Sequence, residues 1–319
     1  MTVKTVIISG SGRSGTTWVL DSLAQANRMR TVFEPLHPVG VPAARRFAYQ
    51  YVDPEADFPE LRAFMDPVLS GGMRSLWANY RIRPDRFNPL RNSPISVYLH
   101  IKKSVDLVKK YGFKPGLSGQ IVKFIRANLM LPWLVKQYGL PTILVVRHPC
   151  AVIASRLKLS SADWSADKAL GYYKGNRVIH QLIGERFGVD IDRPMSSVSA
   201  LCCVWCIENV LPLQWAAQAN YGVVSYENLL VKPETEWPRV IQRLELKNIP
   251  DEVVLKAPSQ QSALDMRDRV FTPEHLDRWR KRYRPEELAS VADMLERFGC
   301  DFYSVESAMP NDVSASGRG

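Results

Sequence analysis

Short apolar runs, rich in β-branched residues, alternate with helix-length segments along this chain. Runs of this length predict buried strands, and we expect them at residues 5–10, 31–34, 120–125, 142–147 and 221–227. Helices are expected at residues 16–27, through LMLPWLVKQYG (129–139) and through a segment that holds three cysteines (199–215). Strands that alternate with helices predict an α/β fold with a parallel sheet flanked by helices on both faces. Ligands of such sheets bind beyond the carboxyl ends of the strands.

Two long segments interrupt this alternation. Residues 35–114 are rich in Pro, Arg and aromatic residues, and residues 156–200 have mixed charge. We expect both to be insertions that form the acceptor site or its lid, within a single domain over residues 1–303. The composition of residues 304–319 predicts a disordered tail.

The composition fits a protein with a large buried core, since 46% of the 319 residues are hydrophobic. No unbroken apolar run approaches the roughly 18–20 residues that span a bilayer. The first apolar run, at residues 6–9, is too short for a signal peptide. We therefore expect a soluble cytoplasmic protein with no transmembrane segment. A membrane anchor outside the given residues is the open alternative.

The net charge of +10, from 42 Lys+Arg against 32 Asp+Glu, indicates anionic partners. The basic residues are scattered along the sequence and form no single stripe, so we expect no nucleic-acid partner. A phosphorylated cofactor and an acidic glycan agree equally well with this charge.

The five cysteines include a cluster at Cys202, Cys203 and Cys206, and the last two have CxxC spacing. No second CxxC and no nearby histidine completes a four-ligand zinc set. The surrounding residues read as a buried helix, so we expect packed thiols and no metal site.

The turn after the first predicted strand reads GSGRSGTTW (residues 10–18). A strand, a glycine-rich turn and a helix N-terminus make an anion site, because backbone N–H groups point into the turn and the helix dipole adds partial positive charge. This turn offers backbone N–H groups, hydroxyls and one forked cation from Gly12, Arg13, Ser14, Gly15, Thr16 and Thr17. The sheet is therefore expected to be P-loop-like. An ordinary strand-to-helix turn is the less favoured interpretation.

The turn departs from the nucleoside triphosphate loop at one position. Thr16 stands where those loops carry the lysine that contacts the β- and γ-phosphates. No predicted strand ends in the aspartate that would bind magnesium, since residues 142–147 end in Arg147 and residues 31–34 end in Glu34. These features argue against hydrolysis of a nucleoside triphosphate.

Residues 12–18, GRSGTTW, resemble the 5′-phosphosulfate loop of the sulfotransferases that use 3′-phosphoadenosine 5′-phosphosulfate (PAPS). Arginine at its second position is typical of the carbohydrate and tyrosylprotein branches of that family. Residues 147–155, RHPCAVIAS, are similar to the family's 3′-phosphate signature. Arg147 at a strand end and Ser155 about two helical turns later can both reach one phosphate. The resemblance implies PAPS as the donor, 3′-phosphoadenosine 5′-phosphate (PAP) as the product, and no required metal.

Weaker similarities extend the likeness along the chain. Residues 224–234 resemble a stretch in which a tyrosine, here Tyr226, lies near the adenine. Trp18 matches the aromatic residue that stacks on the adenine, although it could instead anchor the first helix in the core. Residues 278–281 resemble a C-terminal basic segment that closes over the nucleotide, which implies a contact from Arg280. A solvated helix face explains the same charges.

Sulfonate transfer requires a base that takes the proton of the acceptor. Glu34, in the FEPLHP segment at residues 33–38, resembles the glutamate of an EP motif in the Golgi carbohydrate sulfotransferases, which implies that Glu34 is the base. We expect its pKa to be adjusted by partial burial against Arg13. His37 is the rival base and His100 a distant third. A helix cap or an ion-pair partner is the structural alternative for Glu34.

Residues 122–126, VKFIR, resemble the KxxR of the same carbohydrate branch. Lys123 and Arg13 are the candidates for stabilising the migrating sulfonate and the leaving phosphate. In the structural alternative, Lys123 is an interior strand lysine, which is uncommon without a partner.

These features predict a PAPS-dependent sulfotransferase that modifies a hydroxyl of a glycan or glycoconjugate. A small-molecule or tyrosyl hydroxyl on the same scaffold is the first alternative. A P-loop kinase, or a nucleotide-binding protein that transfers no sulfonate, is the second.

Overall fold

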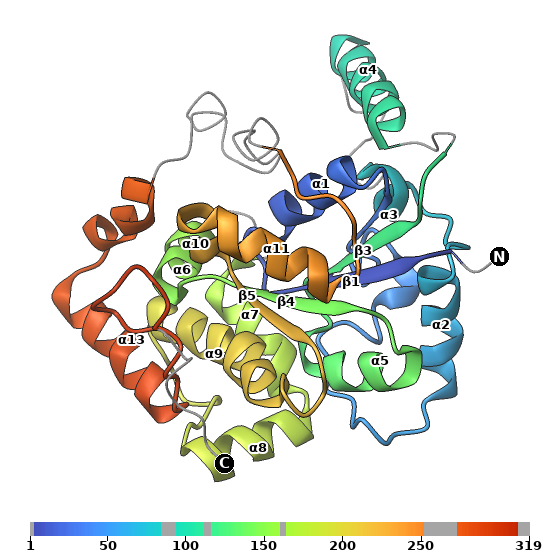
Figure 1. The fold of residues 1–319 in the computed structure, drawn as a ribbon. Coiled ribbons are helices and arrows are strands. Elements are labelled where there is room, and N and C mark those ends of the chain that lie inside the picture. Colours follow the sequence, from blue (N-terminus) through green and yellow to red (C-terminus); the bar gives the residue numbers. More distant parts are fainter. Residues whose placement is uncertain (1–2, 84–93, 112–115, 160–163, 252–272, 312–319) are drawn as a thin grey trace.

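The computed structural model describes residues 3–83, 94–111, 116–159, 164–251 and 273–311 (Figure 1). At its centre lies a five-stranded sheet in the order β2-β3-β1-β4-β5, in which every neighbouring pair is parallel. The strands are β1 (Thr5–Ser9), β2 (Arg30–Phe33), β3 (Gln120–Phe124), β4 (Thr142–Val146) and β5 (Gly222–Ser225). Each strand lies within two residues of its prediction.

Helices connect and cover these strands. The described α-helices are α1 (Thr16–Ala26), α2 (Pro59–Leu69), α3 (Leu76–Tyr80), α4 (Pro94–Tyr111), α5 (Leu131–Tyr138), α6 (Pro149–Leu157), α7 (Ala166–Lys174), α8 (Arg177–Phe187), α9 (Ser197–Trp215), α10 (Tyr226–Val231), α11 (Pro233–Arg243) and α13 (Pro285–Arg297). Short 3₁₀ segments add Pro42–Ala44, Asn128–Met130 and Pro273–Arg282.

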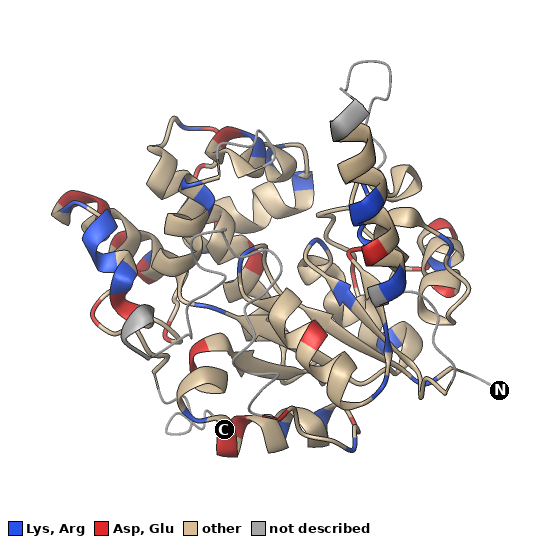
Figure 2. Cartoon of the chain, turned by 90° about the horizontal axis from the view of Figure 1, so that it is seen from above, with Lys and Arg blue, Asp and Glu red and all other residues tan. Residues whose placement is uncertain are grey.

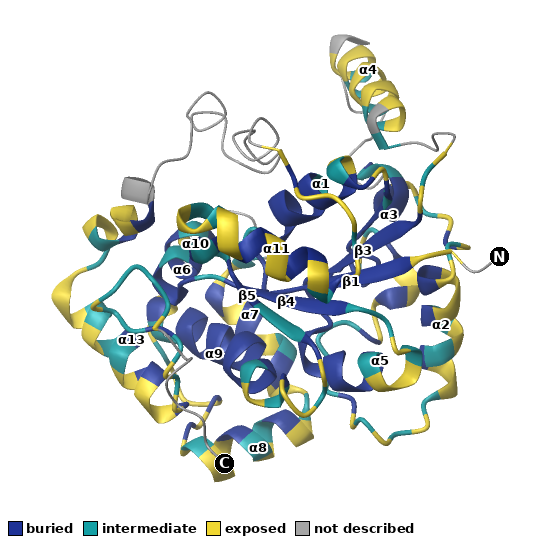
Figure 3. Cartoon of the chain, in the orientation of Figure 1, coloured by how far each residue is buried: buried dark blue, intermediate teal, exposed yellow. Residues whose placement is uncertain are grey.

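The sheet is covered on both faces, which confirms the predicted α/β class. Figure 1 shows α1 and α11 on one face and α5 and α9 on the other. Every residue of β1, β3 and β4 is buried, so these strands read as continuous apolar runs and not as an alternating pattern. Figure 3 shows the same contrast, with buried central strands beneath partly exposed helices.

The parallel register brings several strand ends to one edge of the sheet. Ser9 pairs with Phe124, and Phe33 pairs with Lys123, so β1, β2 and β3 end at nearly the same level. The residues that follow these strands therefore converge at the carboxyl edge, where a parallel sheet places its ligands.

Helix α9 runs through the core. By length and composition it could cross a membrane, but 78% of its apolar window is buried inside the protein. All five cysteines of the chain are free thiols; those of α9 are buried, and burial raises the pKa of Cys203 and Cys206. Their packing agrees with the predicted buried helix.

The two predicted insertions supply α2, α3 and α4 in one case and α7 and α8 in the other. The first residues of the predicted tail contact the rest of the protein. The main-chain oxygens of Val305 and Glu306 accept hydrogen bonds from Arg280 at 2.9 and 2.7 Å, and the Asn311 N–H donates to the Phe302 oxygen at 2.9 Å. These contacts hold residues 304–311 against the protein, and residues 312–319 lie outside the described ranges.

Candidate active site

The turn between β1 and α1 has the backbone shape that its glycines permit. Gly15 is the N-cap of α1 and has a φ of 84°, a left-handed conformation that favours glycine. Arg13 adopts a φ of 76°, which is uncommon for a residue with a side chain. The first N–H groups of α1 have no partner within the helix, so they are available to an anion at this turn.

Neighbouring groups approach the glycines too closely for any side chain. A Cβ on Gly10 would lie 2.4 Å from the Val145 oxygen, and one on Gly15 would lie 2.3 Å from the Tyr226 ring. A Cβ on Gly12 would lie 2.2 Å from the ring of Trp164. Two aromatic rings from distant segments therefore lie directly against this turn.

Three arginine side chains lie at the turn. The Arg13 Nε donates to Ser155 Oγ at 2.9 Å, and Arg147 Nη1 donates to the Arg13 oxygen at 3.3 Å. Arg156 Nη2 donates to the Gly12 oxygen at 3.4 Å and pairs with Glu208 at 2.6 Å. Burial lowers the pKa of Arg13, and the charges of Arg147 and Arg156 lower it further. Positive charge is therefore concentrated at this turn.

This concentration is only partly neutralised. Among the described residues, Arg156 has a carboxylate partner, whereas neither Arg13 nor Arg147 forms an ion pair. The buried Nε atom of Arg147 also lacks a hydrogen-bond partner within that part of the chain. Withdrawing a guanidinium group from water without a counter-charge is costly even when it is half-buried, and an anionic ligand would offset that cost.

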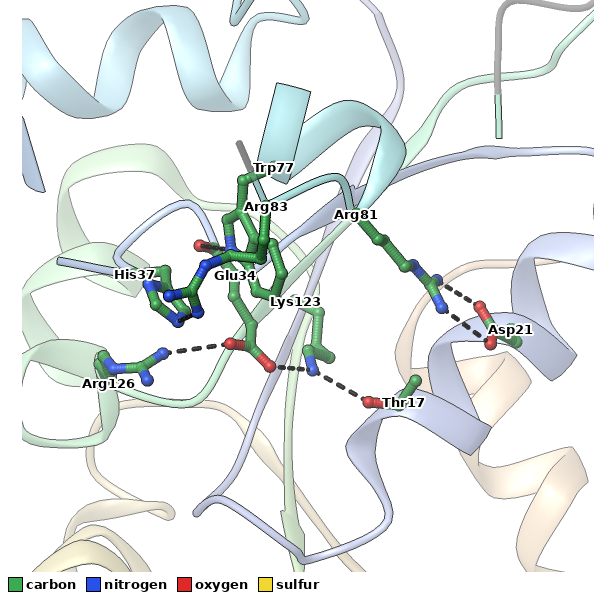
Figure 4. A network of polar contacts seen from close by, with 9 residues as sticks. All are labelled: Thr17, Asp21, Glu34, His37, Trp77, Arg81, Arg83, Lys123 and Arg126. Atoms are coloured by element: carbon green, nitrogen blue, oxygen red, sulfur yellow. Dashed lines mark hydrogen bonds and ion pairs between the residues drawn. The ribbon is translucent and has the colours of Figure 1, made fainter. Parts of the chain in front are cut away.

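Glu34 follows β2 and lies within a network of cations (Figure 4). Its Oε1 accepts from Lys123 Nζ at 2.8 Å, and its Oε2 accepts from Arg126 Nη1 at 3.1 Å. Lys123 Nζ also donates to Thr17 Oγ1 at 3.1 Å, which connects the carboxylate to the first turn of α1. The site therefore combines residues that follow or end β1, β2 and β3.

Opposing effects set the pKa of Glu34. Burial raises the pKa of this carboxyl, but the charges of Lys123 and Arg126 outweigh burial and hold the pKa well below its usual range. Burial lowers the pKa of Lys123 even though Glu34 raises it. The expected contact between Glu34 and Arg13 is not formed. Arg13 donates to Ser155 instead, and the carboxylate of Glu34 is contacted by Lys123 and Arg126.

The backbone of Glu34 is held in an unusual conformation. Its φ is 45°, in the left-handed region that non-glycine residues rarely adopt, and proline follows it. The Glu34 N–H donates to the Lys123 oxygen at 2.9 Å, while its own oxygen accepts from Trp77 Nε1 at 3.2 Å. Such a conformation costs about 1–3 kcal/mol and persists only where surrounding contacts offset that cost. Residues of this kind cluster at functional sites.

His37 lies beside this network with its ring nitrogens engaged. Nδ1 accepts hydrogen bonds from the N–H groups of Val39 at 3.2 Å and Gly40 at 3.0 Å. The other ring nitrogen, Nε2, lies 3.1 Å from Arg83 Nη1, and because a guanidinium can only donate, this contact is a hydrogen bond when Nε2 accepts. Both ring nitrogens therefore face hydrogen-bond donors of the protein itself.

Three residues with implied nucleotide contacts differ in their surroundings. Tyr226 lies against Gly15, with the Arg147 guanidinium 4.5 Å from its ring centre. Trp18 is buried between Tyr226 and Trp237, with ring centres 5.6 and 5.5 Å away, so its packing fits the alternative of a core anchor. Arg280 donates to the C-terminal segment and pairs with Asp277, as a structural residue would.

Sequence reasoning named most of the converging side chains but missed several partners. Arg126 belonged to the recognised KxxR spacing, although its pairing with Glu34 was not predicted. Arg156 directly follows Ser155, and that adjacency was the available signal for a further cation at the turn. Trp77 and Trp164 come from the two insertions, where no periodic pattern indicated which side chains would reach the site.

A scan against protein-family models gave no match, and a search of curated proteins found no significant relative. Among solved structures, the chain is similar to the sulfotransferase domain of the Synechococcus PCC 7002 olefin synthase. The identity is 17%, the TM-score is 0.46, and the match covers 95% of this chain and 97% of that chain. It is also similar to a sulfotransferase domain from the curacin biosynthetic pathway, at 15% identity and a TM-score of 0.41 over 93% of this chain and 99% of that chain. Because both likenesses are distant, the function rests on the residues of the site itself.

Proposed function

We propose that this protein transfers a sulfonate from PAPS to a hydroxyl of an acceptor. The observation that supports this most is the pair of half-buried arginines, Arg13 and Arg147, which lie at the glycine-rich turn without a carboxylate partner among the described residues. A donor with phosphates at two positions matches two cations held by two different elements. The missing lysine at Thr16 agrees with a donor that has no γ-phosphate.

In this proposal the turn binds the 5′-phosphosulfate through its backbone N–H groups and the hydroxyls of Thr16 and Thr17. Arg147 and Ser155 bind the 3′-phosphate, and Arg13 lies between the two positions because it already reaches Ser155. Tyr226 covers the turn beside Arg147 and would contact the nucleoside.

The transfer itself requires one bond exchange. The acceptor oxygen forms a bond to sulfur as the bond between sulfur and the 5′-phosphate oxygen breaks, so PAP leaves with the electron pair. The acceptor proton passes to the carboxylate of Glu34. Lys123, between Glu34 and Thr17, is placed to stabilise the oxygens of the migrating sulfonate.

The ion pairs of Glu34 affect when this residue can act as a base. A carboxylate with a strongly lowered pKa is a weak base, so Glu34 is poorly suited to its role while Lys123 and Arg126 hold it. A sulfonate near Thr17 would compete for Lys123 and weaken that pairing. Donor binding would then raise the pKa of Glu34 and prepare it to accept the proton.

The glycan or glycoconjugate acceptor is the finer part of the proposal. It is supported by the resemblance of Glu34 and Arg126 to the EP and KxxR patterns of the carbohydrate branch, and by the contact between these two side chains. A small-molecule or tyrosyl hydroxyl is the alternative on the same machinery. A cytoplasmic location belongs to this proposal as well.

The test is a comparison of nucleotides followed by a transfer assay. PAP should raise the melting temperature, whereas ATP with Mg²⁺ should raise it much less, because no lysine is available for the γ-phosphate. Radiolabelled PAPS should then transfer its sulfonate to a member of a panel of oligosaccharides, lipids, phenols and tyrosyl peptides. Stabilisation by ATP with Mg²⁺ alone would contradict the proposal, and binding of PAP without any transfer would favour a nucleotide-binding protein.

A further inference from the structure

A cavity of about 270 Å³ opens next to Arg126, on the side of Glu34 that faces away from the glycine-rich turn at residues 10–18 (the phosphate turn). Its walls include His37, Arg45 and Tyr172, and the described side chains that line it also include Arg126 and Lys168. Arg126 is the direct link to the site, because the same guanidinium that lines the cavity donates to Glu34 Oε2 at 3.1 Å.

The cavity is positively charged. Arg45, Arg126 and Lys168 are cations, and no acidic residue is present among the described residues that line it. Arg45 and Lys168 are exposed at the opening, whereas Arg126 is buried, with only 7% of its surface exposed. Cations that converge on one concave space raise the local potential and favour anionic ligands.

The cavity and the phosphate turn lie on opposite sides of the Glu34 carboxylate. Figure 4 shows His37 and Arg126 on one side of it and Thr17 on the other, with Lys123 between Glu34 and Thr17. Oε1 is engaged from the turn side and Oε2 from the cavity side. An acceptor in the cavity would therefore present its hydroxyl to Glu34 from the side opposite the donor, as in-line transfer requires.

The two insertions build this space together. His37 and Arg45 belong to residues 35–114, while Lys168 and Tyr172 lie on α7 within residues 156–200. The Tyr172 ring stacks on Tyr49 with centres 4.3 Å apart, and the guanidinium of Arg126 lies 5.5 Å from the Tyr49 ring. This aromatic pair fixes one wall, so the cations surround a defined space and not an open surface.

We propose that the acceptor carries an anionic group, such as a carboxylate or an ester phosphate, that binds Arg45, Arg126 and Lys168 while its hydroxyl faces Glu34. This inference rests on the proposed sulfonate transfer and adds the charge of the acceptor to it. It applies equally to a sugar acid and to a non-carbohydrate hydroxy acid, since both would place the same charge in the cavity.

The experiment compares matched acceptors that differ only in charge. Suitable pairs are phenyl β-glucuronide and phenyl β-glucoside, 3-hydroxybutyrate and its amide, and glucose 6-phosphate and glucose. Binding to the PAP-loaded protein is measured by calorimetry, and transfer from PAPS is measured for the same compounds. The pairs separate a carboxylate from a phosphate, and a sugar from a non-sugar.

Arg45→Gln and Lys168→Gln are the test variants, and Arg46→Gln is the matched control. Arg46 is an exposed neighbour that lies over the Phe47 ring and does not line the cavity. We expect at least one anionic member to bind at least tenfold more tightly than its neutral partner. Each test variant should reduce that preference severalfold. Arg46→Gln should keep the wild-type preference, and the affinity for PAP should be the same in all three variants as in the wild type.

Equal binding of every pair by the PAP-loaded wild-type protein would overturn this inference while leaving sulfonate transfer intact. The inference would also be overturned if Arg45→Gln weakened the binding of neutral and anionic members equally. Failure of the wild-type protein to bind PAP would instead overturn the proposed function, and with it the inference that depends on it.

Discussion

Glu34 is both positioned and restrained by the same two cations. Lys123, which also contacts Thr17, and Arg126, which lines the cavity, hold its carboxylate from two sides, and they also hold its pKa well below the usual range. His37 is the nearest alternative base, but its Nδ1 already accepts two backbone N–H groups. The choice between these residues can therefore be made by substitutions that keep their hydrogen bonds.

Glu34→Gln should lower kcat by about 10²–10⁴-fold, because the amide retains the shape but cannot take a proton. His37→Asn should change kcat by less than about tenfold, since its amide oxygen can still accept from the Val39 and Gly40 N–H groups. Turnover with labelled PAPS measures both variants, and PAP binding serves as the control for folding. Near wild-type turnover in Glu34→Gln, with loss in His37→Asn, would assign the base to His37.

The lowered pKa of Glu34 also predicts how stability depends on pH. A carboxyl whose pKa is lower in the folded state contributes stability that is present above its unfolded pKa, about 4.3, and lost as the pH falls below it. The wild type should exceed Glu34→Gln by about 3–5 kcal/mol near pH 7, because the variant leaves two buried cations without a counter-charge.

The difference in unfolding free energy between the wild type and Glu34→Gln should shrink by roughly 1 kcal/mol for each pH unit below about 4. Urea unfolding at pH 7, 4 and 3 measures it. Glu60→Gln, at an exposed position in the first turn of α2, is the control and should change stability by less than about 1 kcal/mol throughout. A Glu34→Gln difference that stays constant from pH 7 to pH 3 would show that Glu34 is not held as an ionised partner.

At the scale of elements, strand positions were predictable because β1, β3 and β4 are buried along their whole length. The strand–turn–helix arrangement at residues 5–26 was predictable for a similar local reason, since its glycines and the flanking strand and helix are contiguous. The insertions were not predictable in detail. Tyr49, Trp77 and Trp164 reach the site through contacts with residues far away in the sequence, and no local pattern encodes such contacts.

Gly15 offers a test of the turn that separates backbone strain from contact. Gly15→Ala should destabilise the protein by roughly 1–2 kcal/mol through its positive φ and by about 1–3 kcal/mol more through the clash with Tyr226. Gly139→Ala is the control, because Gly139 has a φ of 59° with no atom near its potential Cβ, so only the first cost applies. Thermal unfolding measures both.

Gly15→Ala should also weaken PAP binding at least tenfold, whereas Gly139→Ala should not change it. If both variants lose the same stability and bind PAP like the wild type, the close packing of the turn has no role in binding.

At the scale of the whole molecule, the net charge of +10 gave only a general indication of anionic partners. Figure 2 shows basic and acidic residues interspersed along the ribbon, so the overall charge does not locate a site. The local arrangement is more informative. Three arginines gather behind the turn, and a second group of cations lines the cavity on the other side of Glu34. Both groups of cations agree with the proposed anionic donor and the proposed anionic acceptor.

The central claim is that Arg147 recognises a 3′-phosphate on a nucleotide whose 5′ end lies in the turn. Calorimetry should compare PAP with adenosine 5′-monophosphate, which lacks only that phosphate, for the wild type and for Arg147→Gln. We expect the wild type to prefer PAP by about tenfold to a hundredfold, since a charged hydrogen bond contributes about 1.5–3 kcal/mol. Arg147→Gln should lose most of this preference while it retains its affinity for the monophosphate. Equal affinity of the wild type for the two nucleotides, or an unchanged preference in Arg147→Gln, would contradict the account.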